Sequence, residues 1–413
     1  MKRPSLSNSD FLKSVAWLFS ANSLSQFLLF AASIWLARLY PPAAFGYFAY
    51  FLSVANVLAI ISTGRYDVVI PLPKFKEDYL HVFWLSLFLL GFFLLAGLLS
   101  VSFAWLLGAK LAWSIISISL LTAAMLGYMS SIKYFWVQKG SFSKLASLRL
   151  VFSITIIVGQ LLLASYYQEG GMIYGYVLGS TLTLGITTLF YFHSFRIRLS
   201  TNHLKRMARC YWPIVRWSLP SGLLNSVTSN LQPIVLATAF GAAEAGWYFL
   251  AYKVAGTPLQ ALSSAISQVY FKKANQLYLN QNRNALLRLS LSVSGAMFIT
   301  ALLVGVFLIV FGEHVFIALF GMEWEKAAHI ARWITLLLLG KFAFHPISAL
   351  AEILGKTKWE FSFNLVWLLY LILTVAIGWG AQDYMMFIKL MVVGGFLLYT
   401  IIWMQFIKAV RKR

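Results

Sequence analysis

Twelve long apolar segments constrain this chain more than any other feature of its sequence. An α-helix needs about 20 apolar residues to cross a bilayer, and each segment is at least that long. We expect membrane spans at 12–38, 43–65, 79–105, 111–136, 142–166, 171–195, 212–240, 243–271, 285–312, 326–354, 358–380 and 383–408. The connections are short except at 65–78 and 196–211. The sequence therefore predicts an all-α polytopic membrane protein of twelve transmembrane helices, and it leaves no room for a soluble domain.

Composition narrows the classes of function. Hydrophobic residues make up 60% of the chain and charged residues only 11%, whereas soluble domains carry about 25% charged residues. The net charge of +21 is compatible with nucleic-acid binding, but the basic residues lie in short connections between apolar segments and form no basic soluble face. We therefore expect no nucleic-acid partner. The single cysteine, Cys210, excludes a disulfide framework, and no Cys or His spacing indicates a metal or another cofactor.

The distribution of Lys and Arg sets the expected orientation. The N-terminus, the C-terminus and the connections after every second span together hold 24 basic residues. The opposite side holds only three, Arg38, Lys110 and Lys326. Basic residues concentrate on the cytoplasmic side of membrane proteins, so both termini are expected in the cytoplasm. The N-terminal apolar run continues to Leu39 without a cleavage site, which argues against a cleavable signal peptide.

An internal repeat divides the chain into halves. The segment LARLYPPAAFGYF, from Leu36, returns 200 residues later as LATAFGAAEAGWYF, from Leu236. Each copy lies between two apolar runs and is interpreted as the tip of a helical hairpin. A weaker echo links LLGAKLAW, from Leu106, to LFGMEWEKAA, from Leu319. We expect two six-helix lobes, 1–195 and 212–413, joined by a basic cytoplasmic linker at 196–211 that lies as an amphipathic segment on the anionic inner leaflet.

Polar residues inside the spans concentrate on the first, second, seventh and eighth helices. On the seventh and eighth they recur every three or four residues, which places them on one face of each helix. Ser and Thr at such positions commonly join neighbouring helices by hydrogen bonds, and we interpret most of them in that way. The Asn and Gln residues favour a hydrated cavity instead. The resulting cleft candidates are Asn22, Gln26, Asn56, Asn225, Gln232 and Gln260.

Buried cations are the strongest functional signal. Lys253 lies about 15 Å into the eighth span, where a charge costs about 2.5–3.5 kcal/mol on insertion scales. Lys341 lies in the middle of the tenth span, and no carboxylate lies deep in any span. Arg216, nearer a helix end, can extend its guanidinium to the interface. These cations indicate a hydrated path that receives an anion; the alternative is that Lys253 is neutral or bonded to backbone carbonyls.

Two further features concern the cytoplasmic end of the second span and the seventh helix. Arg65 and Asp67 are expected to form a local ion pair, either as a structural clamp or as a substrate gate. Pro220 and Pro233 lie in the seventh span, and a proline inside a helix removes a backbone hydrogen bond and bends the helix. Interrupted helices of transporters tend to lie at the moving site, so we expect a hinge there, with a simple packing kink as the alternative.

The chain resembles the polysaccharide flippases (O-antigen, Wzx-type) of the multidrug/oligosaccharidyl-lipid/polysaccharide exporter superfamily. The resemblance rests on three segments: LARLYPPAAFGYFAYFLSVANVLAIISTGRYDVVIPLPK from Leu36, LATAFGAAEAGWYFLAYKVAGTPLQALSSAISQVYF from Leu236, and LFGMEWEKAAHIARWI from Leu319. It implies two lobes in a V, with the first, second, seventh and eighth helices along a central cleft. It also implies transfer of a lipid-linked oligosaccharide, usually on undecaprenyl pyrophosphate, from the inner to the outer leaflet of the bacterial cytoplasmic membrane.

The partners expected from this resemblance are the lipid-linked oligosaccharide and membrane lipids. Coupling to protons or to sodium, and association with polysaccharide polymerase machinery, are left open. A cation-coupled drug or small-molecule exporter of the same superfamily is the nearest alternative, followed by a sugar porter of another twelve-helix fold. A membrane glycosyltransferase or polymerase ranks last, because the chain has neither a large outer loop nor a catalytic constellation of nucleophile, base or paired carboxylates.

Overall fold

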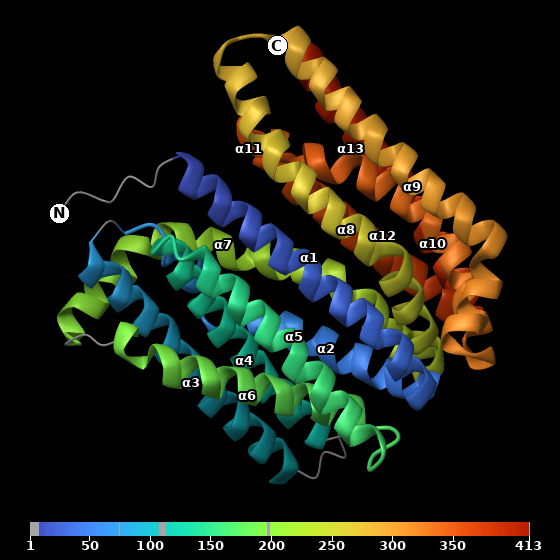
Figure 1. The fold of residues 1–413 in the computed structure, drawn as a ribbon, viewed down its shortest axis with the longest axis horizontal. Coiled ribbons are helices and arrows are strands. Elements are labelled where there is room, and N and C mark those ends of the chain that lie inside the picture. Colours follow the sequence, from blue (N-terminus) through green and yellow to red (C-terminus); the bar gives the residue numbers. More distant parts are fainter. Residues whose placement is uncertain (1–7, 74, 107–112, 196–198, 413) are drawn as a thin grey trace. The chain divides into compact units, whose positions relative to one another are not determined.

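Helices form almost the whole of the structure, a computed structural model that describes residues 8–73, 75–106, 113–195 and 199–412 (Figure 1). No strand occurs among these residues. The first half comprises α1 (Asn8–Leu39), α2 (Pro42–Ser62), the short 3₁₀ helix η1 (Asp67–Val69), α3 (Lys76–Leu106), α4 (Trp113–Gln138), α5 (Phe142–Ala164) and α6 (Gly171–Phe195). Each predicted span of this half coincides with one of the six α-helices.

The second half repeats the plan with longer helices. It comprises α7 (Thr201–Val235), the π-helical turn η2 (Leu236–Phe240), α8 (Ala242–Leu279), α9 (Arg283–Phe320), η3 (Met322–Trp324), α10 (Glu325–Phe344), η4 (His345–Ala349), α11 (Leu350–Ile353), α12 (Thr357–Gly380) and α13 (Tyr384–Lys412). The tenth predicted span is thus built from α10, η4 and α11, and it changes to 3₁₀ geometry where Pro346 interrupts the α-helical hydrogen bonds. All twelve predicted spans coincide with helices, and nine helices of the described part are long and apolar enough to cross a membrane.

The largest differences from the predicted spans are at helix ends. Helix α7 begins at Thr201, so the part of the predicted linker that the structure describes is mostly helix. Residues 196–198 of that linker lie outside the described residues. Helices α8 and α9 each contain 38 residues, or about 57 Å, which exceeds the hydrocarbon thickness of about 30 Å. These helices must tilt or extend beyond the hydrocarbon region.

The contacts group the residues into two compact units. Unit 1 comprises residues 1–32 and 50–231, and unit 2 comprises residues 33–49 and 232–413. The limits between units therefore fall inside three helices, α1, α2 and α7. The sequence-based lobe limits, 1–195 and 212–413, and the cleft that they imply stay predictions.

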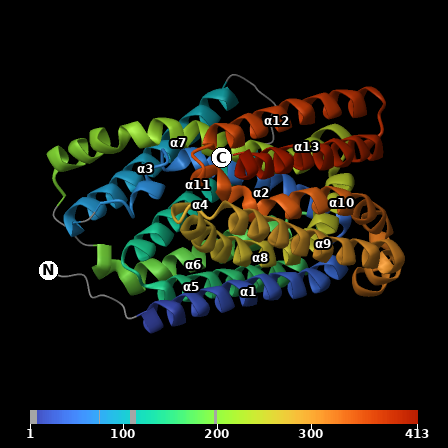
Figure 2. The ribbon, with the colours of Figure 1, turned by 90° about the horizontal axis from the view of Figure 1, so that it is seen from above.

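Each unit has its own core. In unit 1, aromatic rings from α3, α4 and α6 meet at Phe83, Phe135 and Phe195, with centroids 4.9–5.2 Å apart. Figure 2 shows α5 and α6 side by side, and the glycines Gly159 and Gly175 allow their backbones to touch. In unit 2, α10 packs against α8, α9 and α13 (Figure 1), and Ala327, Ala331 and other small buried residues line it.

The two copies of the repeated hairpin tip meet inside unit 2. A Cβ atom on Gly46 would overlap the carbonyl oxygen of Ala242, and one on Gly246 would overlap the carbonyl oxygen of Pro42. Each tip glycine thus faces the backbone of the other copy, in a nearly symmetrical arrangement. Only glycine permits this approach, which explains why it stands at the matching position of both copies. Small residues serve helix contacts in membranes in the same way.

Aromatic and basic side chains hold the first tip on unit 2. The buried Trp324 of η3 donates from Nε1 to the carbonyl oxygen of Ala37 at 2.9 Å and stacks edge-on against Phe45 at 4.8 Å. Arg38 donates to the carbonyl oxygens of Ala318 and Leu319, at 2.7 and 2.9 Å. These carbonyls belong to the last turn of α9, where a cation is stabilised by the helix dipole. The segment from Leu319, which belongs to the weaker repeat, therefore holds the first hairpin tip in place.

We expect the substitution Gly46→Ala to destabilise unit 2 by about 1–3 kcal/mol, because the added methyl group overlaps a backbone atom that cannot rotate away. The measurement is the thermal unfolding temperature of the purified protein in detergent. Gly295→Ala in α9 is the control: no atom lies within 4 Å of its added Cβ, and alanine has the better helix propensity. Equal unfolding temperatures for the two variants would contradict the close backbone contact.

Candidate functional site

Two of the predicted cleft helices are the least apolar of the long helices. In the part of the chain that the structure describes, nine helices are long and apolar enough to cross a membrane, and α7 and α8 are not among them. Of α1, only the stretch Leu24–Leu39 qualifies as a shorter apolar helix. The polar faces of α7 and α8 therefore need protein or water around them rather than lipid.

Within unit 1, α2 and α7 are joined by a network of amides and a hydroxyl. Asn56 donates from Nδ2 to Oδ1 of Asn230 at 3.3 Å, and Ser226 donates to the carbonyl oxygen of Asn56 at 3.3 Å. Asn230 in turn donates to the carbonyl oxygen of Ser226 at 2.8 Å. Asn56 was predicted from the sequence as a cleft residue, whereas Asn230 was not. Asn230 lies two turns after Gly222 on the same face of α7. This spacing in the sequence would have indicated that Asn230 belongs to the face that packs on α2.

The other predicted polar residues of this region differ in exposure. Asn225 and Arg216 are exposed on α7, and the Arg216 guanidinium lies 5.7 Å from the ring of Trp217. Gln26 is half-buried on α1, whereas Gln232 is buried where α7 passes into unit 2. The side chain of Asn22 lies outside the described residues. The assignment of these residues to a substrate path stays a prediction.

Asp67 does not pair with Arg65, contrary to the prediction from the sequence. The Asp67 carboxylate is buried and accepts hydrogen bonds from Thr63 at 2.9 Å and from Ser130 of α4 at 2.6 Å. Arg65 has a left-handed backbone, with φ of 65°, and this turns its side chain toward α7. Its guanidinium lies against Gly222, and its buried Nε atom has no hydrogen-bond partner. Two hydroxyl groups thus replace the expected ion pair.

One lysine links this carboxylate to two further cations. Lys133 of α4 is close enough to interact electrostatically with Asp67, Arg65 and Arg149 of α5. All three cationic side chains are half-buried. From the sequence, Lys133 is predicted only to lie on the cytoplasmic side, and Arg149 is not predicted to bind a ligand. The cluster of Arg65, Lys133, Arg149 and Asp67 carries two more positive than negative charges, which suits a dianionic ligand group.

Unit 2 holds a second polar network, on one face of α8. Lys253, Gln260 and Ser264 lie within about 40° of one another around the helix axis. Gln260 donates to Ser264 at 3.4 Å and to Nε2 of His345 at 3.3 Å, and Ser263 lies 2.8 Å from Nδ1 of the same imidazole. Lys253 is half-buried and has no hydrogen-bond or ion-pair partner among the described residues.

Lys341 points toward a neighbouring position on α8. Its Nζ atom donates to the hydroxyl oxygen of Tyr252 at 2.6 Å and lies 5.3 Å from the centre of that ring. Tyr252 precedes Lys253 and is therefore turned by about 100° around the helix. The two lysines thus occupy adjacent but differently directed faces of α8. A tyrosine, not a carboxylate, satisfies Lys341.

The chemistry of both networks favours anions. Charged ammonium and guanidinium groups donate hydrogen bonds to phosphate and carboxylate groups, and amides and hydroxyls orient sugar hydroxyls. No group of three His, Cys, Asp or Glu side chains that could hold a metal ion occurs in the described part of the chain.

Comparison with known proteins identifies the family. A family model described as "Polysaccharide biosynthesis protein" matches residues 35–329, well over half of the chain. The chain belongs to this family. The lipopolysaccharide biosynthesis protein WzxC of Escherichia coli K12 is 29% identical to the present chain over 166 residues. The match covers 39% of the present chain and 32% of WzxC, so the chain spans about a third of the length of this curated relative.

Solved structures define the fold. The lipid II flippase MurJ, in an inward closed conformation, superposes with a TM-score of 0.74 at 15% identity and covers 94% of this chain and 87% of its own. An inward-facing MATE multidrug transporter of the MOP superfamily gives 0.68 at 17% identity, with 94% and 96% covered. A MOP transporter from Pyrococcus furiosus, described as having a binding pocket of reverse polarity, gives 0.60 at 16% identity, with 97% and 95% covered. This polysaccharide biosynthesis protein is thus a multi-pass membrane protein with the fold of MOP transporters.

We expect Asp67→Asn to destabilise unit 1 by about 1–3 kcal/mol, because Lys133 then loses its nearby carboxylate and the asparagine cannot accept both hydroxyl donors equally. The unfolding temperature in detergent measures this effect. Glu169→Gln removes an exposed carboxylate of the same unit and should leave the temperature unchanged. A result in which both variants match the unsubstituted protein would show that Asp67 does not stabilise the cluster.

Proposed function

We propose that this protein is a flippase that moves a lipid-linked oligosaccharide from the inner to the outer leaflet for cell-surface polysaccharide synthesis. The observation that carries the proposal is the combination of a polysaccharide biosynthesis family with a transporter fold whose polar helices carry cations. The substrate is an undecaprenyl-diphosphate-linked oligosaccharide in the bacterial cytoplasmic membrane, and both termini lie in the cytoplasm. The protein performs no covalent chemistry.

The physical problem is the headgroup. Each polar group of an oligosaccharide costs several kcal/mol in hydrocarbon about 30 Å thick, whereas the prenyl tail belongs there. The polar faces of α1, α2, α7 and α8 provide hydrogen bonds to the headgroup in this proposal. An inside-negative potential favours outward movement of an anion by about 2.3 kcal/mol per charge per 100 mV.

Cations bind the diphosphate in this proposal. Arg65, Lys133 and Arg149 bind it in unit 1, and Lys253 binds it in unit 2. Lys253 is suited to this role because no protein group occupies its ammonium. Lys341, in contrast, is engaged by Tyr252 and supports the fold of unit 2.

Purified protein in liposomes tests both the function and the role of Lys253. We expect protein-dependent transfer of a fluorescent undecaprenyl-diphosphate oligosaccharide between leaflets. Lys253→Ala should slow it about tenfold or more, the effect of one charge-assisted hydrogen bond, and Lys253→Arg should retain part of the rate. Lys272→Ala removes an exposed charge of the same helix and serves as the control.

The outcomes of this assay separate the function from the site. Transfer at the rate of empty liposomes would overturn the flippase proposal. Transfer by Lys253→Ala at the unsubstituted rate would remove Lys253 from the substrate path while leaving the function intact.

A cation-coupled exporter is the second candidate, favoured by the similarity to a MATE multidrug transporter. Its substrate would need a buried carboxylate, and Asp67 is buried. Asp67 is already bound by two hydroxyls and lies near Lys133, which disfavours a cationic ligand. Efflux of a cationic dye that depends on the protein, with no lipid transfer, would favour this candidate. Coupling to protons or sodium, and contact with polymerase machinery, are open in either case.

A hinge in α7 is the mechanical part of the proposal. The chain passes from unit 1 to unit 2 between Leu231 and Gln232, and Pro220 and Pro233 lie on either side of this limit. The π-helical turn η2 follows directly, and such turns often mark functional sites.

We expect Pro220→Ala and Pro233→Ala to slow lipid transfer without lowering the amount of folded protein, because a restored backbone hydrogen bond stiffens the helix. The liposome assay and size-exclusion chromatography measure the two quantities. Pro258→Ala removes a proline inside α8, away from the unit limits, and should have the smaller effect. Unchanged transfer rates in both α7 variants would leave these prolines as simple packing kinks.

A further inference from the structure

The first turns of α7 are fixed on unit 1 along one face. Tyr66 donates from its hydroxyl to the carbonyl oxygen of Ala208 at 2.9 Å, and His203 lies 2.7 Å from the carboxylate of Asp78 on α3. The ring of His203 also stacks on that of His81, with centroids 4.1 Å apart. Met207 is buried in the aromatic core of the unit. The described part of the segment predicted as an amphipathic linker on the inner leaflet is therefore mostly a helix docked on unit 1.

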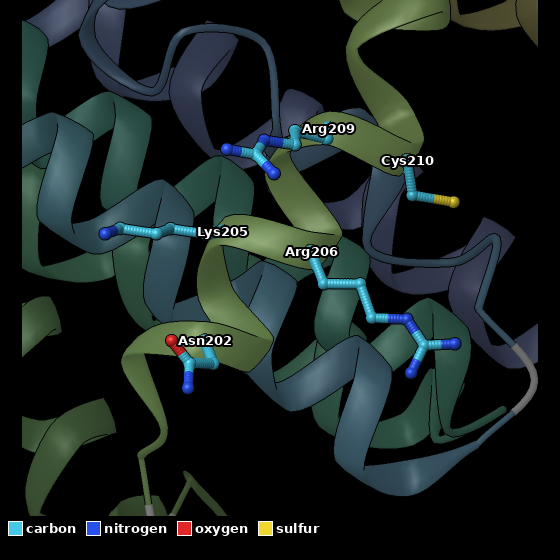
Figure 3. A pocket seen from close by; sticks show the side chains of 5 residues that line it. All are labelled: Asn202, Lys205, Arg206, Arg209 and Cys210. Atoms are coloured by element: carbon cyan, nitrogen blue, oxygen red, sulfur yellow. The ribbon is translucent and has the colours of Figure 1, made fainter.

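The opposite face of the same turns carries an open pocket of about 640 Å³. Its lining consists of Asn202, Lys205, Arg206, Arg209 and Cys210, all exposed (Figure 3). Figure 3 shows Lys205 and Arg209 on one side of the helix, and Arg206 and Cys210 on the other. The lining thus contains three cations, one amide and no carboxylate. Nothing among these residues neutralises the positive charge.

Two exposed tryptophans lie farther along α7, each aligned with one side of this basic face. Trp212 lies within about 20° of Lys205 around the helix axis, and Trp217 lies within about 20° of Arg206 and of Cys210. Trp212 is 55% exposed and Trp217 is 71% exposed. The change from basic to aromatic side chains takes two to three turns, or about 10–16 Å. Tryptophan prefers the headgroup level of the membrane interface.

We propose that this face of α7 is a binding site for the headgroup of an anionic phospholipid. The phosphate contacts Lys205, Arg206 and Arg209, Asn202 donates to its oxygens, and the glycerol and upper acyl chains lie along Trp212 and Trp217. A soluble phosphate would use the cations but not the exposed aromatic side chains that follow them, so the pattern selects an amphiphile. Because α7 passes into unit 2 at its other end, the bound lipid holds the first turns of a helix that belongs to both units.

This lipid site is separate from the substrate path proposed above. Its location at the cytoplasmic leaflet rests on the orientation given in the proposed function. The basic face is also distinct from the cluster of Arg65, Lys133 and Arg149, which is half-buried. A lipid site at α7 can therefore be present or absent whatever the fate of the flippase function.

The single cysteine of the chain makes the site directly testable, because Cys210 lies in the pocket and is free and exposed. The rate of maleimide modification of Cys210 is measured in nanodiscs of phosphatidylglycerol and of phosphatidylcholine. We expect modification to be slower in phosphatidylglycerol by a factor on the order of ten, from the attraction of three basic side chains. The triple substitution Lys205→Gln, Arg206→Gln, Arg209→Gln should abolish the difference between the two lipids.

A matched control removes general effects of a charged membrane on thiol reactivity. Cys210→Ser combined with Asn280→Cys places the thiol in the exposed turn between α8 and α9, and there the two lipids should give similar rates. Protein carrying Lys272→Gln and Lys273→Gln, which loses exposed charge from α8, should keep the protection at Cys210. Unfolding temperatures show that each variant is folded.

Two further measurements of Cys210 modification identify the class of ligand. Millimolar pyrophosphate in phosphatidylcholine nanodiscs should give no protection; protection equal to that of phosphatidylglycerol would make the site one for soluble phosphates and overturn the proposal. Undecaprenyl diphosphate at a few per cent of the lipid should protect no better than the same amount of phosphatidylglycerol, and stronger protection would assign the pocket to the transported lipid. Equal rates in both lipids for the unsubstituted protein would show that no lipid binds here.

Discussion

The close contact between the two hairpin tips is the constraint on which unit 2 depends. Gly46 and Gly246 each face the backbone of the other copy, and any side chain at either position would overlap a carbonyl oxygen. Trp324 and Arg38 then bind the carbonyls that this contact brings near. A segment of the first half is thereby built into the second unit. The limits between units consequently cut through helices and do not coincide with the midpoint of the sequence.

Charge in the interior of the chain follows a consistent rule. Carboxylates are few, and Asp67, the buried one among the described residues, is bound by two hydroxyl groups and lies near Lys133. Of the two lysines predicted as cleft residues, Lys341 bonds to a tyrosine, whereas Lys253 has no hydrogen-bond or ion-pair partner among the described residues. Unpaired cations are costly in a membrane protein, and they are commonly retained where an anionic ligand or hydrated path uses them. The same excess continues to the surface of α7, where three basic side chains precede exposed tryptophans.

Much of the architecture could be predicted from the sequence because the bilayer permits few solutions. A backbone in hydrocarbon must satisfy its own hydrogen bonds, so an apolar run of sufficient length has to be a helix. Each of the twelve predicted apolar segments is helical for that reason. The family resemblance, carried by the repeated tip, was confirmed by the family match. Helix ends were less predictable. Helices α7, α8 and α9 extend beyond their apolar segments into polar sequence, where apolarity does not indicate whether the chain is helical.

The sequence by itself determined the fold class, the two-fold repetition and the chemical character of the candidate site, since these depend on local apolarity, spacing and residue type. Only the tertiary structure decided the partners of individual side chains. It gave Asp67 two hydroxyls in place of Arg65, directed Lys341 to Tyr252, and brought Lys133 and Arg149 near Arg65 from helices far apart in the chain. It also turned the expected linker into a docked helix. Such contacts depend on the rotation of each helix about its axis, which packing sets and apolarity alone does not specify.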